Sequence, residues 1–420
     1  MSKILFGDAL YIKGRIGWQT LKKEEYLDNG DYYLVTGVDI TDEHRIDFSK
    51  CYYVDKVRYE MDDKIQLQNG DIIVTKDGTI GKIALIDKLD KPATLNSHLF
   101  LIRNLKSDVL DNQFLFYILR SERFQKYASN NTSGSNIPAF TQKNISEFEV
   151  DLPPIKTQQK VANILKSIDD KIINNNAINA ELEAMAKTIY DYWFLQFEFP
   201  DENGKPYKSS GGKMVYNEEL KREIPEGWDV AKVIDCVDMV NGYPFSSDDY
   251  VPDGPYKLYT IKNVQDGHIV ADVDNYIDSL PDKLPDACIL EPSDIIMSLT
   301  GNVGRVGLVY ENNALLNQRV VKLVPHNHHI AYTYLLFRDG YMKTRMDNLA
   351  IGAAQKNLSP VNVGNLLVQV PSEILLQSFD KICNPIVEKI VKNYQENQEL
   401  ASLRDFLLPL LMNGQVGFKD

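Results

Sequence analysis

An internal repeat constrains the fold of this chain more than any other feature, because the second half follows the pattern of the first. The segment NGDIIVTKDGTIGKIALID aligns with PSDIIMSLTGNVGRVGLVY, and at this shift Asp71 matches Asp294 and Lys82 matches Arg305. Farther on, SGSNIPAFTQKNISEFEVDLPP aligns with IGAAQKNLSPVNVGNLLVQVPS. Each half is therefore predicted to be a globular domain followed by a helix, and the role of one domain should be mirrored in the other.

A long amphipathic segment follows each repeated domain. Between residues 155 and 194, apolar residues recur at spacings of three and four without an intervening Gly or Pro, which predicts one long helix. At about 1.5 Å per residue, about forty residues extend about 60 Å. The C-terminal segment, residues 378–411, repeats this stripe. The two stripes comprise Val161, Ile164, Ile168, Ile178, Leu182, Met185, Ile189 and Tyr192, and then Phe379, Ile382, Ile386, Leu400, Leu403, Leu407 and Leu410.

Two such helices in one chain are predicted to pair with each other as a coiled coil, since each carries a stripe too apolar for water. A whole domain precedes each helix, which favours antiparallel pairing about a pseudo-twofold axis. Polar residues interrupt both stripes at matching positions, Lys171 and Asn175 in the first and Lys389 and Asn393 in the second. We expect Asn175 to face Asn393, because a buried Asn pair fixes the register of a coiled coil at some cost in stability.

The globular halves show a mixed pattern. Short runs rich in Val, Ile, Tyr and Phe predict strands and hairpins at residues 31–40, 71–86 and 96–104, and residues 114–130 predict one helix. Residues 200–227 are rich in Gly, Pro, Ser and charge and lack apolar periodicity, which is typical of a linker. The predicted fold class is α+β, with two similar mixed α/β domains joined by two long antiparallel coiled-coil helices.

The predicted domain boundaries follow from the repeat and from the linker. A length of 420 residues with 44% hydrophobic residues supports sizeable cores and more than one domain. The predicted parts are a first globular domain at 1–152, a central long helix at 153–199, a linker at 200–224, a second globular domain at 225–370 and a C-terminal long helix at 371–420.

Composition narrows the compartment and the partners. The four cysteines lie far apart without a CxxC pair, so neither a disulfide framework nor a zinc cluster is indicated. No signal-type segment and no run of about 18 apolar residues is present, so we expect a cytoplasmic protein without a membrane span. The net charge of −13 argues for modest DNA affinity of the chain alone, although phosphate contact depends on where cations cluster.

No motif nominates an active site. His326, His328 and His329 lie in a polar, turn-like stretch without a carboxylate spaced to complete a metal site, so a solvated loop is expected there. Neither GxSxG nor a GxxxxGK phosphate loop occurs, and the glycines of DGTIG and TGNVG are typical of hairpin turns. Asp169 and Asp170 are expected on a solvated helix face. The chain is therefore predicted not to be an enzyme, and no bound cofactor or metal is expected.

A binding role fits the residues better. Hairpin tips that place a small turn beside one cation suit the approach to a phosphate or to a groove edge, and polar strings nearby offer donors and acceptors for base edges. The candidate DNA-binding residues are Lys13, Arg15, Lys76, Thr79, Lys82, Asn96, Ser97, His98, Ser133, Ser135 and Asn136 in the first half, and Tyr243, Lys262, Asn302, Arg305, Asn317, Gln318, Arg319, Gln355, Lys356 and Asn357 in the second.

Taken together, these features resemble the DNA specificity subunits of type I restriction-modification systems. The resemblance is carried by LPPIKTQQKVANILKSIDDKI, by ELEAMAKTIYDYWF, by the linker ending in PEGW, by the two GxxG hairpins and by the C-terminal LRDFLLPLLMNGQV. It covers essentially the whole chain. It implies that the globular halves are target recognition domains, each reading one half of a bipartite asymmetric site in double-stranded DNA, and that the two helices set the spacing between the half-sites.

The resemblance also implies partners and places the chemistry in them. Two methyltransferase (modification) subunits would dock on the helices and restriction (motor and nuclease) subunits would join outside, while S-adenosylmethionine, ATP and Mg would be bound by those partners. The chain agrees in one respect, since it has no Asn or Asp followed by Pro-Pro-Tyr or Pro-Pro-Phe. The alternative is a protein-binding scaffold that does not contact DNA, which the more acidic second half would suit.

Overall fold

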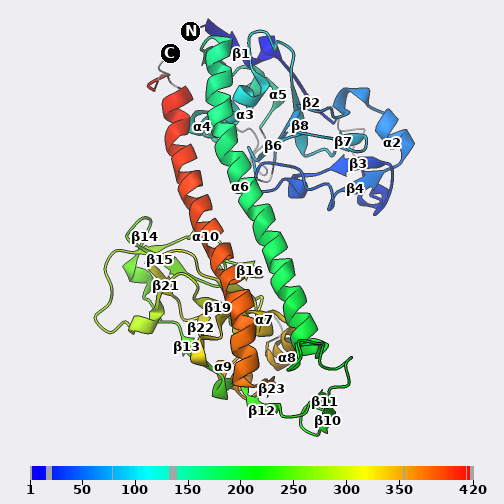
Figure 1. Cartoon of the computed structure of the whole chain (residues 1–420). Helices are drawn as coiled ribbons and strands as arrows, with labels where there is room; N and C mark the ends of the chain where they lie inside the picture. The colour runs from blue at the N-terminus through cyan, green and yellow to red at the C-terminus, as the bar shows by residue number, and fades with distance from the viewer. Residues whose placement is uncertain are drawn as a thin grey trace. The chain divides into compact units, whose positions relative to one another are not determined.

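The structure is a computed structural model that describes residues 2–15, 21–77, 79–131, 140–352, 355–412 and 414–416. The chain forms two compact units (Figure 1). Unit 1 comprises Met1–Ile173 and Glu399–Asp420, and unit 2 comprises Asn174–Gln398. Two long helices, α6 (Ile155–Tyr190) and α10 (Glu373–Met412), contribute to both units. Each unit is therefore built from one globular part and from portions of both helices.

Unit 1 is built around a four-stranded antiparallel sheet in the order β2-β8-β5-β6, comprising Leu10–Gly14, Leu99–Asn104, Ile72–Thr75 and Ile83–Leu85. A second sheet, β4-β3-β7, comprises Tyr52–Val54, Tyr32–Val35 and Ala93–Leu95. The strand β1 (Ser2–Leu5) pairs with β9 (Glu149–Leu152). The helices are α1 (Phe6–Ala9), α2 (Lys56–Glu60), α3 (Asn112–Arg120), α4 (Glu122–Asn130) and α5 (Gln142–Ser146).

Unit 2 repeats this plan with additions. Its main sheet, β13-β22-β19-β20-β16, comprises Val237–Asn241, Val320–Pro325, Ile295–Ser298, Val306–Leu308 and Gly267–His268. The second sheet, β14-β17-β15-β21-β18, comprises Tyr250–Val251, Tyr276–Ile277, Tyr256–Tyr259, Ala314–Leu316 and Ile289–Leu290. The strand β12 (Asp229–Lys232) pairs with β23 (Leu367–Val370) as β1 pairs with β9. The helices are α7 (Ile330–Arg338), α8 (Gly340–Leu349) and α9 (Pro360–Gly364).

The duplicated topology confirms the predicted repeat. Each unit has one GxxG-type segment between two antiparallel strands. These strands are β5 and β6 in unit 1, and β19 and β20 in unit 2. One parallel pair also recurs, β3 beside β7 in unit 1 and β15 beside β21 in unit 2. Both main sheets bury the side chains of their central strands, as the runs of Val, Ile and Leu require.

One prediction about local structure was wrong. Residues 114–130 form two helices rather than one, because Ser121 is extended (φ −62°, ψ 147°) and its hydroxyl accepts a hydrogen bond from the backbone N–H of Phe124 to cap α4. Asp339 breaks and caps the equivalent pair in unit 2. In the stretch predicted as a linker, β10 (Met214–Asn217) and β11 (Arg222–Pro225) form a hairpin.

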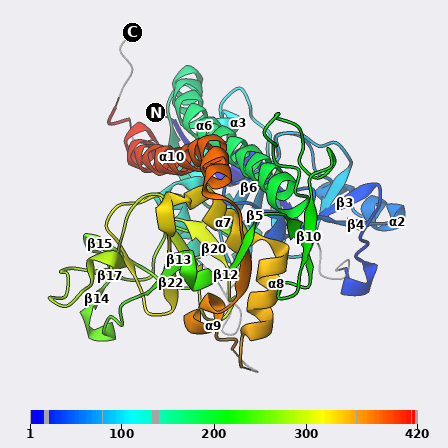
Figure 2. The ribbon, with the colours of Figure 1, turned by 60° about the horizontal axis from the view of Figure 1, so that its bottom comes forward.

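Within each unit the portions of α6 and α10 run antiparallel, as predicted (Figures 1 and 2). In unit 1, Leu165 lies in one buried cluster with Leu408 and Leu411. In unit 2, the buried side chain of Asn393 donates a 2.7 Å hydrogen bond to Asn179. The predicted antiparallel coiled-coil pairing is therefore confirmed.

The register of the pairing differs from the prediction. Asn175 does not face Asn393 but donates to Asn397 and to Glu396, both at 2.9 Å. Residues four apart share one helix face, so Asn175 and Asn179 both reach α10 and form two reciprocal pairs. At the repeat shift of 218 positions Asn175 corresponds to Asn393 and Asn179 to Asn397, so the two pairs correspond to each other in the repeat. Lys171 and Lys389, also assigned to the register, are exposed.

The buried stripe is displaced from the predicted one. Ile164, Ile178, Met185, Tyr192, Ile382 and Leu403 are 36% to 53% exposed. Ala162, Leu165, Ala186, Val387 and Ile390 are buried in their place. The displacement arises because each helix packs against a globular part as well as against the other helix, which turns part of the apolar stripe outward.

Buried ion pairs fasten the helices to the globular parts. Asp169 is 7% exposed, so its predicted solvated position was wrong. Its carboxylate accepts hydrogen bonds from Tyr117 (2.7 Å), Arg120 (2.5 Å) and Arg404 (2.9 Å). Burial raises the pKa of Asp169, but these partners outweigh burial and hold its pKa below the ordinary value. In unit 2, Glu183 of α6 accepts from Tyr334 and Arg338 in the same way.

His329 anchors the start of α10. It is 7% exposed, and its two ring nitrogens lie 2.5 Å from Asp380 and 3.2 Å from Glu373. The solvated-loop prediction is therefore wrong for this histidine. The hydrogen bond to Asp380 is the main reason that the pKa of His329 lies above its ordinary value of 6.5.

Replacing Asn393 with Leu should lower the free energy of unfolding by about 1 to 3 kcal/mol, because Asn179 loses its partner in a buried site. The double variant Asn179→Leu, Asn393→Leu should recover most of this loss, since no polar group then remains unpaired. Urea titrations followed by circular dichroism measure both. A double variant whose loss equals the sum of the two single losses would contradict this pairing.

Raising the pH should weaken the anchor of α10. The folded pKa of His329 is raised, so its ion pairs contribute fully below the unfolded value near 6.5 and are lost as the pH rises through the folded value. Melting temperatures measured from pH 6 to pH 9 should fall more for the wild type than for His329→Gln. Parallel curves for the two proteins would argue against this role.

Candidate nucleic-acid interface

The two hairpin loops are built in the same way from one hydroxyl group. In unit 1, Thr75 Oγ1 accepts a 2.9 Å hydrogen bond from the Lys82 backbone N–H and donates to the carbonyl of Thr79. In unit 2, Ser298 Oγ accepts from the Arg305 N–H at 3.2 Å and donates to the carbonyl of Asn302 at 2.6 Å. Each loop is therefore closed from inside and presents its tip in a fixed shape.

The glycines of these loops are required by the backbone. Gly81 has φ 81° and Gly304 has φ 71°, values that side chains with a Cβ rarely adopt. Their N–H groups donate to the carbonyls of Thr75 (3.1 Å) and Ser298 (2.9 Å). The sequence signal GxxG thus reports a hairpin turn, as predicted. Gly78 lies outside the described residues.

A second turn meets each hairpin loop, because β5 with β8 and β19 with β22 are antiparallel neighbours. In unit 1, Nδ1 of His98 lies 2.7 Å from Oδ1 of Asp77. In unit 2, Nη1 of Arg319 lies 3.5 Å from Oγ1 of Thr300. The two pairs occupy repeat-equivalent positions, and His98 and Arg319 are both exposed. The two units therefore present different side chains, His98 and Arg319, at the same position of the repeat.

Unit 2 adds a third segment to this edge. Asn357 Oδ1 accepts a hydrogen bond from Thr300 Oγ1 at 3.0 Å and lies 3.4 Å from Nη1 of Arg319. Gln318 and Gln355 are exposed. We call Thr300, Arg319 and Asn357 the unit 2 polar cluster. The equivalent segment of unit 1 contains the predicted residues Ser133, Ser135 and Asn136, which lie outside the described residues.

Several predicted contacts of unit 1 serve the fold instead. Arg15 is only 4% exposed and donates to the carbonyl of Leu95 at 2.8 Å and to the hydroxyl of Thr94 at 3.2 Å, so it is withdrawn as a DNA contact. Asn96 is buried, and its Oδ1 accepts from the N–H of His98 at 2.9 Å, which positions the turn. Lys82 points inward and donates to the carbonyl of Ile40.

The remaining unit 1 candidates differ in accessibility. Lys76 is half-buried with its ammonium 5.4 Å from the centre of the Phe100 ring, and burial lowers its pKa. Thr79 is exposed at the hairpin tip. Lys13 on β2 and Ser97 in the turn are half-buried. The exposed edge of unit 1 thus depends mainly on Thr79 and His98.

Two of the four candidate cations of unit 2 are paired with carboxylates. Lys262 pairs with Asp274 at 2.5 Å, and Lys356 pairs with Asp347 at 2.9 Å. Arg305 donates to Gln265 at 2.7 Å. Arg319 is exposed and contacts neutral groups among the described residues. Of the other candidates, Asn302 is exposed, Asn317 is buried and Tyr243 is half-buried.

The arrangement suits recognition of base edges more than tight binding of phosphates. Guanidinium groups pair with guanine and Asn amides with adenine in the major groove. Because Lys262 and Lys356 are paired with carboxylates, the sequence-independent attraction of unit 2 to DNA is expected to be reduced. Asp77 and Thr300, which contact His98 and Arg319, were not identified from the sequence. Their positions immediately before the two GxxG glycines are the signal that identifies them.

Within the described parts of the chain, no group of three or more His, Cys, Asp or Glu side chains is arranged to hold a metal ion. A separate search of the same residues finds no helix that is both long enough and apolar enough for a bilayer. Both findings concern the described residues alone.

Comparisons with known proteins identify the family. The family described as type I restriction modification DNA specificity domain matches residues 15–184 and again residues 225–392. The type I restriction enzyme MjaIX specificity subunit of Methanocaldococcus jannaschii is 26% identical over 84% of this chain and 78% of its own length. The HindI specificity subunit of Haemophilus influenzae is 22% identical over 84% of this chain and 88% of its own.

A solved structure has the same fold. The crystal structure of the type I restriction-modification S subunit from M. genitalium superposes with a TM-score of 0.55 at 19% identity, covering 100% of this chain and 96% of that one. Together with the duplicated topology and the two matches of the sequence family, which span most of the chain, this establishes that the chain belongs to the type I restriction modification DNA specificity domain family.

Proposed function

We propose that this chain is the DNA specificity subunit of a type I restriction-modification complex. Each unit would read one half of a bipartite site in double-stranded DNA with its hairpin tip and the neighbouring turn. The observation that carries the proposal is the pair of repeat-equivalent edges, which present His98 beside Asp77 in unit 1 and Arg319 beside Thr300 in unit 2. Since these side chains differ in chemistry, the two half-sites should differ in sequence.

The chain would recognise DNA without catalysing a reaction. Methylation and cleavage would be performed by methyltransferase and restriction subunits, which would bind S-adenosylmethionine, ATP and Mg. The net charge of −13 supports this division, because a partner that encloses the duplex would supply most of the phosphate contacts. The helices α6 and α10 would set the spacing between the half-sites.

Exposed apolar residues on the helices support docking of two like partners. Unit 1 exposes Ile164 and Leu403, and unit 2 exposes Ile382 and Met185. Ile164 is the repeat equivalent of Ile382, and Met185 of Leu403, since both pairs lie 218 positions apart. Each unit thus exposes the same two apolar positions, and it is their recurrence at repeat-equivalent places that supports two like contacts. Two copies of one methyltransferase subunit would occupy them.

The second candidate function is a protein-binding scaffold that does not contact DNA. The net charge of −13 favours it, because an acidic surface repels phosphates. The two functions differ in one measurement, the methylation of adenines across the genome in cells with and without this chain. A methylation pattern that is unchanged by loss of the chain would support the scaffold.

Replacing Arg319 with Ala should relax recognition of one half-site, with a loss of about 1 to 3 kcal/mol of discrimination at the affected base pair. The other half-site should be read as before, because unit 1 is unchanged. Binding of oligonucleotide libraries by the complex with its methyltransferase partner measures this. Lys208→Ala removes one exposed positive charge elsewhere in unit 2 and is the matched control. Equal weakening on every sequence would show that Arg319 contacts only phosphate.

Replacing Leu403 or Met185 with Asp should each release one methyltransferase subunit, and the double variant should release both. A charge placed on an apolar contact is costly to bury. Native mass spectrometry of the co-expressed complex counts the subunits. Ile374→Asp is the control, because Ile374 is 77% exposed and its repeat equivalent is Lys156. Two methyltransferase subunits per chain in Leu403→Asp, in Met185→Asp and in the double variant would rule out docking at these positions.

A further inference from the structure

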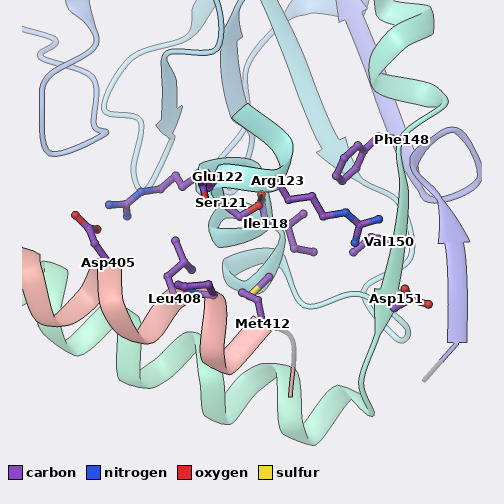
Figure 3. A pocket seen from close by; sticks show the side chains of 12 residues that line it. Ile118, Ser121, Glu122, Arg123, Phe148, Val150, Asp151, Asp405, Leu408 and Met412 are labelled. Atoms are coloured by element: carbon purple, nitrogen blue, oxygen red, sulfur yellow. Dashed lines mark hydrogen bonds between the residues drawn. The ribbon is translucent and has the colours of Figure 1, made fainter. Parts of the chain in front are cut away.

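Unit 1 contains an open cleft of about 630 Å³ (Figure 3). Its apolar walls come from α3, from β9 and the residue before it, and from α10. They consist of Ile118, Phe148, Val150, Leu408 and Met412. In Figure 3, Leu408 and Met412 point from α10 toward Ile118, while Asp405 and Asp151 stand at opposite ends. Five charged residues also line it, Arg120, Glu122, Arg123, Asp151 and Asp405, so a cleft of this size is suited to a peptide segment that carries both apolar and charged side chains.

The repeat places an equivalent surface in unit 2. At the shift of 218 positions, Ile118 corresponds to Leu336, Val150 to Val368, and Met412 to Phe194. The charged position Asp151 corresponds to Gln369, and Arg123 corresponds to Tyr341. The cleft of unit 1 can therefore be compared, position by position, with a surface of the same chain.

In unit 2 this surface is covered by the chain itself. The guanidinium of Arg222 donates to Gln369 and lies 5.6 Å from the centre of the Tyr341 ring. Two residues later Ile224 is 1% exposed, and Trp228 is 9% exposed. Ile224 and Trp228 belong to the same buried cluster as Leu336, Val368 and Phe194. A short segment, Arg222–Trp228, thus covers the equivalent surface of unit 2 with one cation, one aliphatic side chain and one aromatic ring.

No described residue of unit 1 covers the cleft in this way. Asp151 is exposed, whereas Gln369 at the equivalent position is 6% exposed. Met412 is half-buried, whereas Phe194 is fully buried. The side chains Leu408 and Met412 are also smaller than Tyr190 and Phe194, their equivalents, which leaves the space open.

The charges of the cleft favour a cation near Asp151. Arg123 lines the cleft but donates to the carbonyl of Glu149 at 2.8 Å, as Arg345 donates to the equivalent carbonyl of Leu367 at 2.7 Å in unit 2. Among the described residues, the carboxylate of Asp151 has no ion-pair partner. A carboxylate in place of an amide would hold a guanidinium more strongly, because such charge-assisted hydrogen bonds are about twice as strong as neutral ones.

We propose that this cleft binds an extended segment of a partner protein, with an Arg or Lys two residues before a large aliphatic side chain and an aromatic residue close behind. The cation pairs with Asp151, and the apolar side chains enter between Ile118, Val150 and Met412. The segment occupies unit 1 as Arg222–Trp228 occupies unit 2. Because unit 2 is already filled, each chain has one such site among the described residues, whatever DNA it recognises.

A labelled peptide with the sequence of residues 219–229, ELKREIPEGWD, is the probe. Fluorescence anisotropy with the full chain should show saturable binding. Asp151→Lys should weaken binding by on the order of tenfold or more, about 1.4 kcal/mol. A peptide carrying Arg222→Glu should bind the Asp151→Lys variant more tightly than it binds the wild-type chain. Asp108→Lys makes the same charge change on an exposed residue of unit 1 outside the cleft and should bind the original peptide normally.

Met412→Trp is a second variant, which should fill the cleft and abolish peptide binding without lowering the melting temperature. Absence of binding to the wild type overturns the proposal. Two further results overturn it by naming another occupant. One is binding that requires removal of residues 413–420, which would mean that the chain's own last residues fill the cleft. The other is dissociation of a dimer by the peptide, seen by sedimentation, which would assign the cleft to a second copy.

Discussion

The buried polar contacts of α6 and α10 are the constraint on which the rest of the structure depends. Asn179 and Asn393 are buried between the helices and satisfy each other at 2.7 Å, beside the contact of Asn175 with Asn397. A shift of either helix by one turn would break both pairs and leave two of these four amides without an amide partner, at a cost that apolar packing does not recover. The register of the two helices in this stretch is thereby fixed.

Duplication explains both the sameness and the difference of the two units. The hydroxyl of Thr75 and that of Ser298 close equivalent loops, so the scaffold of the recognition edge is retained. The exposed side chains carried by that scaffold differ, His98 in one unit and Arg319 in the other. A rigid loop with variable side chains is suited to reading different sequences, because readout depends on donors and acceptors held in fixed positions.

The same duplication reveals where the two units are unequal. The segment Arg222–Trp228 completes unit 2, while no described residue covers the equivalent cleft of unit 1 in this way or forms an ion pair with Asp151. The charges of the recognition edges are a separate point. Two candidate cations, Lys262 and Lys356, are paired with acids at 2.5 and 2.9 Å, which reduces the positive charge that they offer to phosphates.

The sequence by itself determined the repeat, the α+β class, the hairpins and the two antiparallel helices, because periodicity and turn glycines are local signals. Only the tertiary structure decided the helix register, the buried role of Asp169 and the withdrawal of Arg15 from the DNA contacts. An exposed and a buried arginine look alike in a sequence. Their difference arises from contacts with residues far away in the chain, here Thr94 and Leu95, which are brought together only when the sheets form.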